Sequence, residues 1–66
     1  MKITLNGKPH EAGDSATVRD VLTQIGFGDR PVVVELNQEA LLVRQHATTA
    51  LKEGDVMEVV QITAGG

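Results

Sequence analysis

The chain has 66 residues, a net charge of −3 and a hydrophobic fraction of 41%, which are values typical of one small globular domain. A domain of this size has too little interior for both a core and a deep substrate cavity, so an enzyme with its own pocket is not indicated. The absence of cysteine excludes disulfides and thiolate chemistry, and an acidic chain with Phe27 as its one aromatic residue lacks the basic, ring-bearing face of a nucleic-acid binder.

The N-terminal segment has the pattern of a β-hairpin. Ile3 and Leu5 alternate with polar residues, which is the periodicity of a half-buried strand. Asn6-Gly7 is a strong hairpin signal, because a type I′ turn needs positive φ at both central residues. Residues 8–12 are then the returning strand. Pro9 indicates that this strand lies at a sheet edge, since proline cannot donate a ladder hydrogen bond.

An amphipathic helix is predicted next. Thr17 is a candidate N-cap, and Asp20 three residues later completes a capping-box pattern. Gly26 just beyond the helix predicts a Schellman ending, in which Phe27 packs back on Leu22. Apolar residues fall at i, i+3, i+4 and i+7 and define one face: Val18, Val21, Leu22 and Ile25.

The second half of the chain predicts three strands and a turn. β-branched residues mark the first strand, a short apolar segment marks the second, and a Glu-Gly-Asp turn precedes the third. In the first of these, alternation places Val32, Val34 and Leu36 on one face and Glu35 on the other. The predicted strands are residues 32–36, 41–43 and 56–62, with an irregular segment at 44–50 and the turn at 53–55.

These elements predict an α+β fold, a ubiquitin-like β-grasp roll with a mixed sheet of four to five strands packed on one helix. The helix has one apolar face, so it must cover one face of a sheet, and the last strand is apolar enough to lie centrally beside the first. Residues 1–63 would form this domain and residues 64–66 a flexible tail. We expect one core formed by Ile3, Leu5, Val18, Val21, Leu22, Ile25, Val34 and Val59.

The last predicted strand has apolar residues on both faces. Met57 and Val59 point one way, and Val56, Glu58, Val60 and Ile62 point the other way. One face must meet the helix, and the other is either a partner surface or a covered core edge. We expect Glu58, Val60 and Ile62 to form much of a docking face, whereas the acidic run of Glu53, Asp55 and Glu58 is either a docking patch or a solvated turn.

The pair Gly65-Gly66 directly follows this strand, and taken alone it reads equally well as a frayed tail. The whole chain, however, resembles the ThiS/MoaD family of sulfur carriers, and its thiamin-pathway branch most closely. It departs from the family at His46, where many members have an aromatic residue, and this puts the local packing in question. The resemblance rests on residues 1–7, 17–22, 32–37, 44, 47–55 and 61–66.

The resemblance implies a protein co-substrate with no catalytic side chain, metal or cofactor of its own. A ThiF-like enzyme would adenylate the Gly66 carboxylate with MgATP. A sulfur donor such as a cysteine desulfurase, acting indirectly, would convert it to a thiocarboxylate, and a ThiG-like thiazole synthase would take the sulfur. Because glycine has no Cβ, the tail of Ala64, Gly65 and Gly66 could enter a narrow channel in the partner. We expect a monomer when free.

Alternatives remain open at this stage. The chain could carry sulfur for another pathway, act as a ubiquitin-like modifier joined to lysines through Gly66, or be a binding module with an inert tail. His10 and His46 lack companions at metal-ligand spacing, so surface or packing roles are favoured for both. No apolar run approaches the ~20 residues that span a bilayer, and a signal-peptide pattern is absent, so we expect a cytoplasmic protein without membrane contact.

Overall fold

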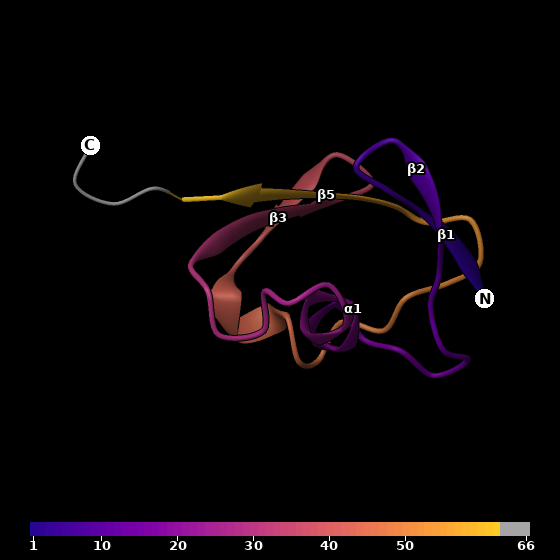
Figure 1. Ribbon diagram of the computed structural model, residues 1–66, viewed down its shortest axis with the longest axis horizontal. Coiled ribbons are helices and arrows are strands. Elements are labelled where there is room, and N and C mark those ends of the chain that lie inside the picture. Colours follow the sequence, from indigo (N-terminus) through magenta and orange to yellow (C-terminus); the bar gives the residue numbers. More distant parts are fainter. Residues whose placement is uncertain (63–66) are drawn as a thin grey trace.

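The computed structural model describes residues 1–62. Its strands form one mixed sheet in the order β2-β1-β5-β3-β4, and helix α1 covers one face of that sheet (Figure 1). Strand β5 pairs in parallel with β1 and antiparallel with β3, which confirms the predicted β-grasp arrangement with a central last strand. The elements are β1 (Lys2–Leu5), β2 (Lys8–Glu11), α1 (Val18–Gln24), β3 (Val32–Leu36), β4 (Glu39–Leu41), the 3₁₀ helix η1 (Val43–Gln45) and β5 (Val56–Gln61).

Two-residue turns fix the register of both hairpins. Asn6 and Gly7 have φ values of 50° and 82°, as a type I′ turn requires, and β2 with its proline lies at a sheet edge as predicted. The β3–β4 hairpin turns in the same way at Asn37 and Gln38, with φ values of 52° and 69°. Glutamine rarely adopts this left-handed conformation, so Gln38 is a strained position.

Both ends of α1 follow the predicted capping chemistry. The Thr17 Oγ1 accepts a hydrogen bond from the Asp20 amide at 3.2 Å, and the Asp20 carboxylate accepts one from the Thr17 amide at 2.8 Å. At the other end Gly26 has φ 86°, and the Phe27 amide donates to the Leu22 carbonyl at 2.8 Å, which is a Schellman ending. Seven residues are too few for a stable isolated helix, so α1 depends on its packing.

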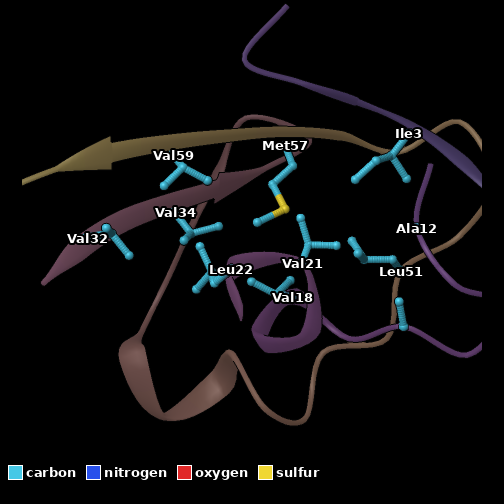
Figure 2. Packing of buried hydrophobic residues seen from close by; sticks show 11 residues of the cluster. Ile3, Ala12, Val18, Val21, Leu22, Val32, Val34, Leu51, Met57 and Val59 are labelled. Atoms are coloured by element: carbon cyan, nitrogen blue, oxygen red, sulfur yellow. The ribbon is translucent and has the colours of Figure 1, made fainter. Parts of the chain in front are cut away.

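The core lies between α1 and the inner face of the sheet. Figure 2 shows Met57 extending from β5 toward Val21 of the helix, with Val34 of β3 beside it. The predicted core is confirmed, with Leu5 and Ile25 only partly buried at its margin. The complete cluster of buried apolar residues is Ile3, Ala12, Ala16, Val18, Val21, Leu22, Val32, Val34, Leu51, Met57 and Val59.

The short strand predicted at residues 41–43 is misplaced. The turn at residues 37 and 38 starts β4 at Glu39, directly opposite Leu36, so the strand ends at Leu41. Leu42 and Val43 are exposed, because the chain turns there into η1, where the Gln45 side chain accepts a hydrogen bond from the Leu42 amide at 2.8 Å. The last strand also ends at Gln61, one residue earlier than predicted.

Asp55 is buried and is neither a solvated turn residue nor part of an exposed docking patch. Its carboxylate accepts hydrogen bonds from the Lys52 amide at 2.8 Å and the Asn37 side-chain amide at 3.1 Å. The Asn37 side-chain oxygen in turn accepts one from the Val56 amide at 2.9 Å. This network joins the β3–β4 turn to the start of β5 and sets where the last strand enters the sheet.

Candidate functional site

The predicted tail residues Ala64, Gly65 and Gly66 lie outside the described residues, as does residue 63. The structure does describe the strand that leads to them. Strand β5 runs across the molecule and ends on the side opposite the N-terminus (Figure 1). The Ile62 amide, one residue beyond the strand, donates to the Pro31 carbonyl at 3.0 Å, so the chain is anchored up to this point.

Strand β5 is fixed from both sides. Its pairing with β3 extends from Val32 opposite Gln61 to Leu36 opposite Met57. On the other side, Asn6 prolongs the pairing with β1 beyond the end of that strand. Its side-chain oxygen accepts a hydrogen bond from the Val59 amide at 2.8 Å. A group attached after Ile62 therefore follows a strand that is hydrogen-bonded on both sides.

An apolar and acidic patch covers the outer face of the sheet near the end of β5. Val60 is 62% exposed and lies opposite Val33 of β3, which is 43% exposed. The exposed residues Glu58 and Glu35 form the next cross-strand pair on the same face. Like charges directly opposite each other destabilise a sheet, so the stability of the fold does not account for the Glu35–Glu58 pair. We call Val33, Glu35, Glu58 and Val60 the outer patch.

The predicted faces of the last strand are confirmed within β5, but Ile62, predicted on the same face as Val60, lies beyond the strand and lines a cavity on the helix side. Met57 and Val59 are buried against the helix, whereas Glu58 and Val60 are exposed. Sequence reasoning missed Val33 and Glu35 as members of this surface. Alternation within β3 put Glu35 on the outer face, but only the register with β5 brings it beside Glu58.

A cavity of about 140 Å³ lies on the helix side of the sheet, next to the end of β5. We call it the root cavity. Ile62, the third predicted docking residue, is 47% exposed and lines this cavity. The cavity therefore adjoins the last described residue before the predicted tail. The remaining lining residues are Arg19, Leu22, Phe27, Gly28, Arg30, Pro31, Val32, Val43 and His46.

His46 is the unusual residue of this cavity. Its side chain is only 4% exposed, and its Nε2 atom has no hydrogen-bond partner among the described residues. Burial lowers the pKa of His46, and the nearby positive charge of Arg19 lowers it further, so the ring is predominantly neutral at neutral pH. We predicted a surface or a packing role for this residue, and its burial agrees with packing.

Residues 1–62 contain neither a cluster of metal-ligating side chains nor a helix suited to cross a membrane. No group of three or more His, Cys, Asp or Glu side chains is arranged there to hold a metal ion. Likewise, α1 and η1 do not meet the length and apolarity that a membrane-crossing helix needs.

Comparison with known proteins gives consistent matches. Residues 3–66 match the model of the ThiS family. The chain is 38% identical over 64 residues to the sulfur carrier protein ThiS of Thermus thermophilus, covering 97% of this chain and 98% of that protein. A crystal structure of a thiamine biosynthesis protein (ThiS) from Geobacter metallireducens superposes with a TM-score of 0.83 at 33% identity, covering 100% of both chains.

The chain also matches longer proteins. It is 38% identical over 66 residues to a thiazole synthase of Magnetococcus marinus and 35% identical to one of Paramagnetospirillum magneticum. All of this chain is covered in both matches, but it spans only 20% of the length of each synthase.

Proposed function

This chain belongs to the ThiS family, and we propose that it is a sulfur carrier for thiamin thiazole synthesis, which holds sulfur as a thiocarboxylate at Gly66. The observation that carries the proposal is the pair Gly65-Gly66, which in the sequence follows the central, doubly anchored strand β5 after three further residues. The 62 described residues then serve as a rigid support, and the partner enzymes supply the catalytic groups. The chain would be a co-substrate and not a catalyst.

The chemistry requires a free α-carboxylate on Gly66. Such a group is ionised at neutral pH and can attack the α-phosphorus of MgATP in the adenylating enzyme, with release of pyrophosphate. The acyl adenylate is a far better acyl donor than the carboxylate. A persulfide sulfur displaces AMP from it, and a thiol then reduces the resulting acyl disulfide to the thiocarboxylate. A thiazole synthase accepts this sulfur.

The outer patch is our candidate for docking to the adenylating enzyme. Val33 and Val60 offer an exposed apolar centre, and Glu35 and Glu58 place two negative charges beside it. A buried apolar anchor with charge at its rim is a common hot-spot arrangement. The like-charged pair of glutamates would be relieved by a basic group on the partner, which explains its presence on a folded surface. Ile62, the third predicted docking residue, lies just beyond the strand and lines the root cavity on the helix side.

Intact mass spectrometry of the gene product tests the chemistry. After incubation with adenylating enzyme, MgATP and a persulfide donor, the mass should rise by the difference between sulfur and oxygen, and fragmentation should place the change on residue 66. Deletion of Gly66 should abolish the gain without lowering the melting temperature. One extra residue after Gly66 should also abolish it, because the carboxylate becomes an amide. Adducts on lysines of other proteins, with no thiocarboxylate, would instead indicate a ubiquitin-like modifier.

Paired substitutions test the docking face. Val60→Asp should weaken binding to the adenylating enzyme by at least tenfold, because it places a charge at the centre of the apolar contact. Leu42→Asp is the matched control, since Leu42 is 52% exposed and lies outside the outer patch. Both variants should keep the melting temperature of the wild type. Equal affinities of the two variants for the enzyme would show that the outer patch is not the docking face.

A further inference from the structure

Strand β1 stops pairing before β5 ends. β1 pairs with β5 only through Thr4 and Leu5, whereas β3 follows β5 as far as Gln61. In Figure 1 β5 continues past the β1–β2 hairpin toward its C-terminal end. Among residues 1–62, the part of β5 that carries Glu58 and Val60 therefore has ladder pairing with β3 alone.

The Asn6 side chain takes over where the backbone of β1 stops. The Thr4 amide donates to the Asp55 carbonyl at 2.9 Å. Two residues later the Asn6 amide donates to the Met57 carbonyl, also at 2.9 Å. In this parallel ladder the next donor, the amide of Val59, would meet the main-chain carbonyl of residue 6 if β1 continued. The chain instead turns at Asn6, where φ is 50°, and the Asn6 Oδ1 accepts from the Val59 amide at 2.8 Å.

Asparagine meets two requirements at this position. The type I′ turn needs positive φ, which glycine, asparagine and aspartate tolerate better than other residues do. The bond to Val59 needs a side-chain oxygen that reaches the neighbouring strand, and glycine lacks one. The turn alone would accept glycine at residue 6, so the side-chain oxygen is the part of Asn6 that the hairpin does not require.

The Asn6 contact falls inside the stretch of β5 that carries the outer patch. Val59 lies between Glu58 and Val60, and its own side chain is buried against the helix. Val59 also pairs with Val34 of β3. The Asn6 bond adds the second side, so the main chain between the two patch residues is held from both edges. Without it, this stretch keeps its pairing with β3 and loses its tie to the β1 side.

We propose that Asn6 is a positioning residue for the adenylation of Gly66. Its side chain acts through Val59, by holding Glu58 and Val60 in the arrangement that the adenylating enzyme binds. Asn6 is 53 positions away from Val59 in the sequence, so a turn residue at the start of the chain supports docking near its end. The enzyme and the reaction rest on the proposed function, whereas the bond between Asn6 and Val59 does not.

Kinetics of the adenylating enzyme test this role, with the full chain as the varied substrate and pyrophosphate release as the signal. Asn6→Gly keeps the turn, because glycine tolerates positive φ, and removes only the acceptor. The KM for this variant should rise roughly three- to tenfold, as the loss of one hydrogen bond allows. Its kcat should stay within about twofold of the wild-type value, since Gly66 is unchanged and only binding is weakened. Asn6→Asp retains a side-chain oxygen and should restore the KM.

Two controls separate positioning from stability. Thr17→Ala removes a bond of the same kind at the start of α1, since the Thr17 Oγ1 accepts from the Asp20 amide. It should leave the KM unchanged, even where its melting temperature falls as far as that of Asn6→Gly. In a Val60→Ala background, Asn6→Gly should have little further effect on the KM, because both substitutions act on the same docking surface.

Hydrogen exchange of the free chain checks the bond itself. The Val59 amide should exchange about tenfold faster in Asn6→Gly, while the Ile62 amide, which donates to Pro31, keeps its rate. An unchanged KM for Asn6→Gly overturns the proposal, as does an equal rise for Thr17→Ala or a failure of Asn6→Asp to restore the KM. Failure of the proposed function shows itself separately: the wild-type chain then supports no pyrophosphate release, while exchange at Val59 still depends on Asn6.

Discussion

Replacing His46 by phenylalanine should stabilise the protein, and more so in mild acid. The folded chain keeps this ring buried, with an Nε2 atom that has no partner within residues 1–62. An unsatisfied buried polar group costs about 1–3 kcal/mol, and phenylalanine removes that group. The slightly larger ring has room to adjust, because His46 borders the root cavity of about 140 Å³.

The pH dependence follows from the lowered pKa of His46. In the unfolded chain this histidine titrates near 6.5, whereas burial and Arg19 hold the pKa lower in the folded state. Below pH 6.5 the unfolded state therefore binds a proton that the folded state does not. Wild-type stability falls as the pH drops through this window, with a slope of up to about 1.4 kcal/mol per pH unit. Above pH 6.5 the ring is mostly neutral in both states, so this loss of stability is absent.

The measurement is urea and thermal unfolding of the wild type and His46→Phe at pH 5 and pH 7.5. At pH 7.5 the variant should melt about 4–8 °C higher for each kcal/mol gained in a domain of this size. The difference in unfolding free energy should be larger at pH 5. The control His10→Gln removes the other histidine and should retain the wild-type fall below pH 6.5. A difference that is the same at both pH values, or a variant less stable than wild type, would refute this reasoning.

Three further substitutions test the fold. Leu22→Ala should cost about 2–5 kcal/mol by opening a cavity under the sheet, and an unchanged melting temperature would contradict the orientation of α1. Gln38→Gly should stabilise by about 1 kcal/mol, because φ 69° is strained for glutamine and not for glycine; a lower urea midpoint would count against this explanation. Asp55→Ala should cost about 1.5–3 kcal/mol for each charge-assisted hydrogen bond that it loses, and a loss below 1 kcal/mol would mean that the Asn37 network contributes little.

Much of the fold was predictable because its signals are local. The turn at Asn6-Gly7, the capping of α1 by Thr17 and Asp20, and its ending at Gly26 each depend on a few consecutive residues. Alternation along β5 likewise distinguished the buried Met57 from its exposed neighbours in the same strand. Each of these choices follows from backbone geometry within a single element.

The position of β4 was not predictable from apolar residues alone. Leu42 and Val43 are apolar and look like strand residues, yet they are exposed on the turn into η1. The strand begins earlier, because the tight turn at Asn37 and Gln38 returns the chain directly onto β3. A short apolar run is a weak signal when hairpin register is set by the turn.

By itself, the sequence determined the order of elements, the inner and outer faces of β5 and the Gly65-Gly66 ending, since these depend on periodicity and local chemistry. Only the tertiary structure decided that Val33 and Glu35 complete the outer patch, that Asp55 is buried and that His46 lines a cavity beside Ile62. These features depend on which distant segments meet. Strand register and burial arise from contacts between residues far apart in the chain, which no local pattern encodes.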